Sequence, residues 1–535
     1  MKKLFVILFL TATIPMLAAE RIFVSTDRSV YIAGESLFCS LFCMETETMQ
    51  ASALSAVAYL EIASEDATAA TAKIALMEGR GTGRVLLPAS IPTGNYVVYA
   101  YTAAGGTKDC LAGAKTISIF NTTSNARSNV QVISDSDYST TIPSDASEGL
   151  RLVVVGQARC GKDFEIALSQ ALGKSARVSF SVYRLDDINQ PDNGGIRAFT
   201  NTLRQTGSHE KNAAVAEYEG EIIKAKVKGG TASTAMLSSA GSPTDVYLGK
   251  PDADGNVLFY TNNIYGDREL VCSVDSPDAY LSIEDPFIHP AVGGIPALKM
   301  SPSLFSSLVS RKTAASQVHA DSLLTPLPKR KDNLTESLPL TRYHLDDYTR
   351  FHSLSEIFVE IVNELSIGKS HGKECLRLGF KDPTTGRYYL RENILVMLDG
   401  VILPEITPLK RMDAMLFKDI DIYYGPFAIG GVSFNGIVNF VTKQDYVKVI
   451  DFPAGVSVVD FKGVCAPVAY LGAAPGRDQD NRNLLYWHPD VAITKEETLR
   501  FSLKAPSNPG HFAAVAEGFT DEGAPVYAFW NFMVL

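Results

Sequence analysis

Two apolar strands around a glycine-rich turn lie within residues 394–443, and no other stretch constrains the fold as tightly. The first strand ends in Asp399-Gly400, which closes a tight turn because glycine enters the left-handed region without a steric penalty. The second alternates apolar and polar residues over 420–424, is interrupted by glycines, and resumes over 436–443. The pattern predicts adjacent buried strands joined by turns.

These strands resemble the plug domain of TonB-dependent outer-membrane receptors. In that family a strand ending in Asp-Gly precedes a strand ending in Gly-Pro, followed by a run of the form Gly-x4-Gly-x-Ile-Asn-x-x-Thr-Lys. The resemblance covers residues 343–444, with conservative departures at Phe417, Ile422, Val438 and Phe440. A hairpin in some other α+β domain stays open as an alternative. The motif positions, which we interpret as structural, are Asp399, Gly400, Gly425, Pro426, Gly430, Gly431, Gly436 and Asn439.

A helix is predicted just before these strands. Ser353 and Glu356 have the spacing of a capping box, in which each side chain bonds the other residue's backbone N–H. The apolar residues that follow fall on one helical face. They are Ile357, Phe358, Ile361, Val362 and Leu365.

The first twenty residues have the three parts of a secretory signal peptide. Two lysines precede an apolar run at residues 4–17, and Ala18-Ala19 precedes Glu20. We expect cleavage after Ala19. No cysteine stands at the lipid-acceptor position, and no later segment has the roughly 20 continuous apolar residues of a spanning helix. The mature chain is therefore expected to be exported, without a lipid anchor or a transmembrane segment.

Two motifs near the N-terminus resemble macroglobulin-type β-sandwich domains. Residues 26–35 read T-D-R-S-V-Y-I-A-G-E, with Ala33 where that family has proline, and residues 94–102 read G-N-Y-V-V-Y-A-Y-T. Short alternating strands at regular spacing favour a sandwich of about 100 residues. The tyrosines of 94–102 are interpreted as a packed sheet face in preference to a ligand platform.

The whole chain is predicted to be multidomain and mainly β, with several macroglobulin- or Ig-like β-sandwiches and one α+β plug-like domain. This combination resembles exported proteins of Bacteroidetes-type bacteria in which macroglobulin-like domains precede a plug-like module that has no barrel. The expected parts are a signal peptide (1–19), a macroglobulin-like sandwich (20–121), a linker (122–148), one or two sandwiches (149–290) with a flexible insertion near 186–213, a linker (291–340), the plug-like domain (341–447) and a C-terminal sandwich (448–535).

Composition argues against several functions. The net charge is −10 and there is no basic cluster of the kind that nucleic-acid binding requires. Seven cysteines, an odd number, cannot all pair internally. Cys39 and Cys43 stand four apart in one predicted strand, roughly 13 Å, which is too far for a bond. We interpret most cysteines as small core residues, with one or two disulfides as the alternative.

No catalytic or metal-binding motif is recognised. The chain lacks a G-x-S-x-G elbow, an H-E-x-x-H pair and a phosphate loop. His344, His352 and His371 do not have ligand spacing, Cys375 does not supply a macroglobulin thioester, and Asp252-x-Asp254-Gly255 is favoured as a hairpin turn over a calcium loop. We expect no enzyme activity, no cofactor and no metal; a hydrolase site would require a cleft of converging groups.

The leading functional hypothesis is a non-enzymatic interaction protein in the periplasm, associated with the outer membrane. Its plug-like module would dock on an outer-membrane or periplasmic protein, possibly a β-barrel of a receptor, export or assembly machine. The alternative is a macroglobulin-like protease-binding or envelope-defence protein without a thioester, for which residues 186–213 are the only candidate bait.

Overall fold

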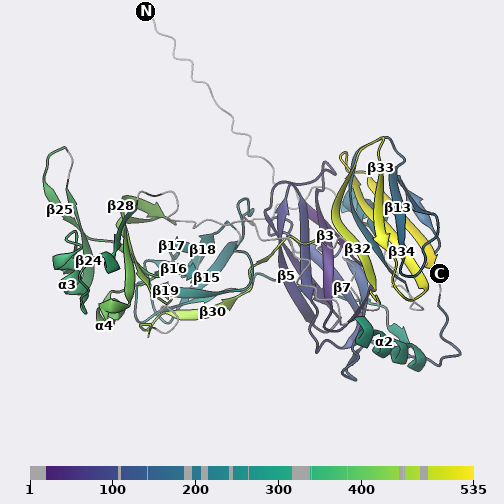
Figure 1. Ribbon diagram of the computed structural model, residues 1–535, viewed down its shortest axis with the longest axis horizontal. Coiled ribbons are helices and arrows are strands. Elements are labelled where there is room, and N and C mark those ends of the chain that lie inside the picture. Colours follow the sequence, from purple (N-terminus) through teal and green to yellow (C-terminus); the bar gives the residue numbers. More distant parts are fainter. Residues whose placement is uncertain are drawn as a thin grey trace, which may run out of the picture.

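Short strands form most of the chain, as the alternating patterns predict, and they assemble into four modules (Figure 1). We name these the N-terminal sandwich, the split sandwich, the small sandwich and the distal module. The computed structural model describes residues 20–106, 110–140, 142–185, 195–206, 215–239, 245–262, 264–315, 338, 340–370, 372–381, 384–444, 450, 452–469 and 480–535. The predicted signal peptide and His371 lie outside these residues.

The N-terminal sandwich has a core of alternating inward side chains that includes Leu37, Ile62, Ile74 and Val98. Its strands follow the order β1-β3-β6-β5-β4-β7-β8-β2, and the short β9 pairs with β7. The strands are β1 (Glu20–Thr26), β2 (Val30–Ile32), β3 (Ser36–Glu45), β4 (Val57–Ala63), β5 (Thr68–Met77), β6 (Arg80–Leu86), β7 (Thr93–Tyr101), β8 (Lys115–Phe120) and β9 (Arg127–Ser128).

The split sandwich is built from two parts of the chain that are remote from each other in the sequence. Strand β14 lies between β32 and β34, so neither part can bury its apolar face alone. The expected separate C-terminal sandwich at 448–535 is therefore wrong. The two sheets are β11-β35-β34-β14-β32 and β12-β13-β33, from β11 (Ala146–Glu148), β12 (Leu150–Val155), β13 (Asp163–Gln170), β14 (Ala176–Arg184), β32 (Leu484–Ile493), β33 (Thr498–Lys504), β34 (Gly510–Thr520) and β35 (Pro525–Val534).

The small sandwich also takes a strand from a distant part of the sequence. Its sheets are β18-β15-β20 and β17-β16-β19-β30, and the strand β31 that follows β30 runs parallel to β5 of the N-terminal sandwich. The strands of the small sandwich are β15 (Ile222–Lys228), β16 (Ala235–Ser239), β17 (Val246–Gly249), β18 (Asn256–Tyr260), β19 (Arg268–Val274), β20 (Tyr280–Ile283) and β30 (Ser457–Phe461), and β31 is Val464–Cys465.

Both expected linkers contain structure that packs on the N-terminal sandwich. Strand β10 (Val130–Val132) runs parallel to β21 (Leu298–Met300), and helix α2 (Pro302–Ala315) buries Leu304 and Leu308 beside Phe120. The prediction of linkers at 122–148 and 291–340 is corrected for these parts. The two strands that pair, β10 and β21, are remote from each other in the sequence, so no local pattern shows their pairing.

The expected flexible insertion contains helix α1 (Gly195–Thr206). Ile196, Phe199 and Leu203 lie on its buried face and pack on Phe23 and Phe519. Their helical spacing was the available signal. The flanking residues 186–194 and 207–213 lie outside the described residues.

The distal module has a mixed five-stranded sheet, β22-β28-β29-β26-β27, and a three-stranded sheet, β23-β24-β25. The predicted capping box is confirmed, because Ser353 and Glu356 bond reciprocally at the start of α3. The helix is shorter than predicted: it ends at Glu360, and Leu365, expected on its apolar face, begins β23. The elements are β22 (Leu340–His344), the 3₁₀ turn η2 (Leu345–Asp347), α3 (Leu354–Glu360), β23 (Leu365–Ser370), β24 (Lys373–Lys381), β25 (Tyr388–Arg391), β26 (Leu395–Leu398), β27 (Val401–Ile402), α4 (Thr407–Arg411), η3 (Ala414–Leu416), β28 (Phe417–Ile429) and β29 (Val432–Thr442).

Within the described residues, which include all seven cysteines, there is no disulfide, and Cys39, Cys43, Cys110 and Cys272 are buried. This agrees with their interpretation as small core residues. Among the described residues, the helices are too short or too polar to cross a membrane.

Candidate functional site

The predicted Asp-Gly turn joins β26 to β27 and is fixed by the neighbouring strand β29. Asp399 and Gly400 both have positive φ, 47° and 83°. The Gly400 N–H donates to Asn439 Oδ1 at 3.0 Å, and the Asp399 carboxylate accepts from the backbone N–H and the hydroxyl of Thr442 at 2.7 and 2.6 Å. The structure thus brings Asp399, Gly400 and Asn439 together, in a structural network.

The other motif positions are spread along the β28–β29 hairpin. Gly425 and Pro426 form an irregularity where the register shifts between Tyr424 and Phe427. Gly430 and Gly431 make the turn, with φ of 55° and 76°. These positions shape the hairpin, and they do not converge on a common site.

Two of the motif glycines permit close packing. A Cβ on Gly430 would overlap the backbone carbonyl oxygen of Leu248, so the hairpin turn lies directly against β17 of the small sandwich. A Cβ on Gly436 would lie 2.7 Å from Leu378 Cδ2 on β24. Gly430 therefore allows the distal module to pack closely on the small sandwich, and Gly436 allows the two sheets of the distal module to pack on each other.

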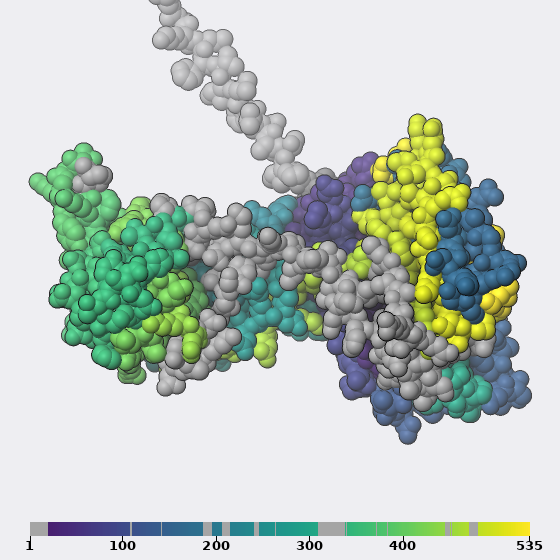
Figure 2. Space-filling view, in the orientation of Figure 1, coloured from purple at the N-terminus to yellow at the C-terminus, as the bar shows by residue number. Residues whose placement is uncertain are grey.

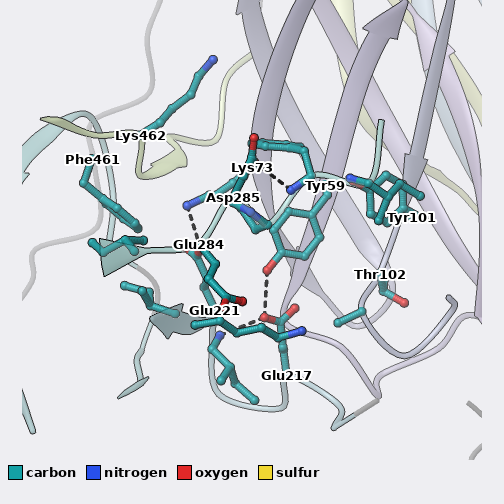
Figure 3. Close-up of a pocket in the computed structure, with 18 of the residues that line it drawn as sticks. Tyr59, Lys73, Tyr101, Thr102, Glu217, Glu221, Glu284, Asp285, Phe461 and Lys462 are labelled. Carbon is teal, nitrogen blue, oxygen red and sulfur yellow. Dashed lines mark hydrogen bonds and ion pairs between the residues drawn. The ribbon is translucent and has the colours of Figure 1, made fainter. Parts of the chain in front are cut away.

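A cavity of about 550 Å³ lies where the N-terminal sandwich meets the small sandwich (Figure 3). We call it the junction pocket. Strands β4, β5 and β7 provide Tyr59, Lys73 and Tyr101, and the segment entering β15 provides Glu217 and Glu221. Further lining residues come from 283–288 and from Phe461 and Lys462.

A buried ion pair spans this junction. Lys73 Nζ lies 2.6 Å from Glu221 Oε1, and both side chains are 3% exposed. The same ammonium stands 4.0 Å from the centre of the Phe461 ring. Burial lowers the pKa of Lys73 and raises the pKa of Glu221, and their mutual attraction opposes both shifts. Both groups therefore stay charged only because they lie close enough to attract each other.

Glu217 is the second buried carboxyl group of the junction. Its Oε1 accepts hydrogen bonds from the Tyr59 hydroxyl and the Ile222 N–H, both at 2.8 Å, while its backbone carbonyl accepts from Ala56 N–H at 2.7 Å. Its Oε2 is buried without a hydrogen-bond partner among the described residues. Burial raises the pKa of Glu217 to about 7. Its charge therefore changes near neutral pH.

A third carboxylate fixes the chain that leaves β20. Glu61 Oε1 accepts from the Tyr101 hydroxyl at 2.8 Å, and that hydroxyl accepts from Ile288 N–H at 2.9 Å. Residues 287–295 then cover the tyrosine face of the N-terminal sandwich, beside Tyr59 and Tyr99. The predicted interpretation of the tyrosines as a packed sheet face is confirmed.

The junction pocket has one feature of an active site, a carboxyl group with a pKa near 7. However, no serine, cysteine or histidine is found among the described residues that line it. The described residues also contain no group of three or more His, Cys, Asp or Glu side chains suited to a metal ion. The Lys73–Glu221 ion pair and the Tyr59–Glu217 hydrogen bond connect the two modules. Sequence reasoning did not single out Lys73, Glu217 or Glu221, because single charged residues in separate strands carry no motif.

No protein-family model matches the chain, and no curated protein matches it. Solved structures that align with it include the native conformation of E. coli alpha-2-macroglobulin, at 9% identity and a TM-score of 0.25, over 97% of this chain and 40% of that one. Salmonella alpha-2-macroglobulin reacted with methylamine aligns at 9% identity and a TM-score of 0.24, again over 97% and 40%.

The E. coli adhesin FdeC aligns at 12% identity and a TM-score of 0.15, over 80% of this chain and 98% of that one. The chain thus spans about 40% of the length of the macroglobulins with which it aligns. With TM-scores this low, none of these likenesses transfers a function. A function is therefore inferred from the contacts and exposed surfaces of this chain itself.

Proposed function

We propose that this chain is a non-catalytic binding protein of the cell envelope, exported to the periplasm, whose distal module docks on an outer-membrane partner such as a β-barrel. The observation that carries the proposal is the free edge of β22. Within the part of the chain that the structure describes, β22 pairs only with β28, and four of its five side chains are exposed. An open edge accepts a strand from a partner through main-chain hydrogen bonds.

Side-chain contacts to β28 hold this edge in register. Arg342 binds the Asp421 carboxylate through two hydrogen bonds of 2.6 and 2.7 Å, and His344 Nδ1 lies 2.7 Å from Asp419 Oδ1. Both aspartates belong to β28. The strand is therefore preorganised, which lowers the conformational entropy lost when a partner strand pairs with it.

The other support comes from the sequence and from the junction pocket. The resemblance to receptor plug domains suggests an outer-membrane setting, and the predicted signal peptide suggests export. In the junction pocket, Lys73 pairs with Glu221 across the two modules, and Glu217 is bonded to Tyr59. These buried polar contacts hold the modules together, a role that suits a binding protein.

Site-specific photo-crosslinking tests the proposal. A photoreactive residue at Thr341, on the β22 edge, is expected to trap an outer-membrane protein in cells that produce the chain. Ser502 is the matched control, because it is exposed on β33, an edge strand of the split sandwich. If Thr341 yields no outer-membrane adduct above background, or if Ser502 yields the same adduct equally well, the docking proposal fails.

The protease-binding alternative is less well supported by the geometry. Its candidate bait contains α1, whose apolar face packs on Phe23 and Phe519 and is not presented to a protease. Incubating the folded protein with broad-specificity proteases tests this alternative. A trapped, uncleaved protease complex would favour it over the docking role.

A further inference from the structure

The three-stranded sheet of the distal module differs in charge from the rest of the protein. Residues 365–391 contain six Lys and Arg against two Asp and Glu, whereas the whole chain carries a net charge of −10. One of these cations, Arg377, is paired with Glu392, and the acidic Glu374 is paired with Lys410 of α4. Lys381 and Arg387, at the outer end of the sheet, form no ion pair within the described part of the chain.

Strand β25 also carries a concentration of exposed apolar surface. Tyr388, Tyr389 and Leu390 are 56%, 46% and 54% exposed. Among the described residues they are the only run of three consecutive large apolar side chains that are exposed. In Figure 1 and in Figure 2 this strand projects from the free end of the molecule, away from the three sandwiches. We call residues 384–391, together with Lys381, the aromatic tip.

The exposed side chains point to both faces of the strand. Successive side chains of a strand alternate, so Tyr388 and Leu390 share one face and Tyr389 lies on the other. Opposite them, β24 pairs Lys381 with Tyr388 and Phe380 with Tyr389. A Cβ on Gly379 would overlap the Tyr388 hydroxyl, so that ring lies across β24. On the other face, the Arg391 guanidinium stands 4.2 Å from the centre of the Phe380 ring.

A rigid protein surface would cover one face of such a tip and leave the other in water. A lipid headgroup layer surrounds both faces at once. Tyrosine suits this layer because its ring is apolar and its hydroxyl stays hydrated. Lysine and arginine extend their stems along the apolar surface and place their charges at the phosphates.

We propose that the aromatic tip binds an anionic phospholipid surface, with Tyr388, Tyr389 and Leu390 entering the headgroup region and Lys381 and Arg387 meeting lipid phosphates. The rest of the chain is acidic and is repelled by such a surface, so the contact also orients the molecule with its distal module toward the membrane. This site is separate from the β22 edge and stands whether or not a protein partner docks there.

Vesicle sedimentation with the purified mature chain tests the inference. The protein is expected to bind vesicles in which phosphatidylglycerol is mixed into phosphatidylcholine and not vesicles of phosphatidylcholine alone, with binding that weakens as salt is added. The double variant Lys381→Gln/Arg387→Gln is expected to bind about 25-fold more weakly, since one basic residue near an anionic surface contributes about fivefold. The control, Arg151→Gln/Lys495→Gln, removes two exposed cations of the split sandwich and is expected to bind normally.

A fluorescence measurement locates the contact independently of affinity. In Tyr389→Trp, the new indole is expected to shift to the blue and to be quenched by brominated phosphatidylglycerol. Tyr260→Trp, at an exposed position of the small sandwich, is expected to show neither change.

Equal binding to neutral and anionic vesicles overturns the proposal, and so does unchanged binding of the Lys381/Arg387 variant. If the parent protein does not bind vesicles while a photoreactive residue at position 389 traps a protein, the aromatic tip is a protein-binding surface and the lipid assignment is wrong. These vesicles contain no protein, so their result is independent of the docking proposal for β22.

Discussion

Lys73 Nζ lies 2.6 Å from Glu221 Oε1, and this buried pair joins two modules whose sequences are separated by the whole first half of the split sandwich. Removing one partner of a buried pair leaves an uncompensated charge, which costs more than the pair contributes. The junction pocket is therefore where single substitutions are most informative.

We predict that Lys73→Met destabilises the protein by about 3–5 kcal/mol, because Glu221 then remains buried without its cation. The double variant Lys73→Met/Glu221→Leu is expected to recover most of the loss, since it removes both charges. Urea unfolding of the three proteins measures this. Equal destabilisation in the single and double variants would show that packing, and not charge, dominates at this position.

Glu217 is predicted to make stability depend on pH between about 4.5 and 7. Its pKa is raised to about 7 in the folded chain, so the folded state holds a proton that the unfolded state has lost. This proton contributes about 3 kcal/mol to the free energy of unfolding. The contribution is fully present below pH 4.5 and is lost as the pH rises to 7.

Glu217→Gln is expected to flatten this part of the pH profile and to be more stable than the parent at pH 8. Its amide oxygen can still accept from Tyr59 and Ile222. Urea unfolding at several pH values checks the prediction, with the exposed Glu496→Gln as the control. A variant profile parallel to that of the parent across this window would show that Glu217 is already ionised in the folded protein.

Gly430 and Gly431 provide a matched pair for the contact between the distal module and the small sandwich. Both have positive φ, so alanine costs about 1 kcal/mol of backbone strain at either position. Only at Gly430 does the new Cβ also overlap the Leu248 carbonyl oxygen, whereas at Gly431 nothing lies within 4 Å. Gly430→Ala is therefore expected to weaken the packing of the distal module on the small sandwich, whereas Gly431→Ala is expected to leave this packing unchanged. Small-angle scattering and limited proteolysis distinguish them, and equal behaviour would contradict the proposed contact.

The backbone conformation at position 400 is predicted to require glycine. With φ of 83°, Gly400→Ala is expected to destabilise the distal module by about 1–2 kcal/mol, and Gly400→Asn by less, because asparagine tolerates the left-handed region. Thermal unfolding of the variants measures the order. If alanine and asparagine are equally well tolerated, the turn adjusts its conformation and the prediction fails.

Local signals were enough for three elements of the distal module, but not for its three-stranded sheet, where Leu365 was expected in a helix and lies in β23. The Asp399-Gly400 turn, the capping box at Ser353 and Glu356, and the β28–β29 hairpin each depend on residues close in sequence, whose backbone preferences are fixed by sterics and hydrogen bonding. These elements therefore appear where the sequence places them.

Tertiary structure alone decided the division into modules and the junction pocket. Strand β14 reads as one more alternating strand, and nothing in its sequence shows that its neighbours are β32 and β34. Likewise Lys73, Glu217 and Glu221 become a site only when two sandwiches meet and exclude water from their charges. The sequence by itself determined the strands, turns and caps, because these depend on near neighbours. Pairing between remote strands and burial of charge depend on the complete fold, and the structure alone reveals them.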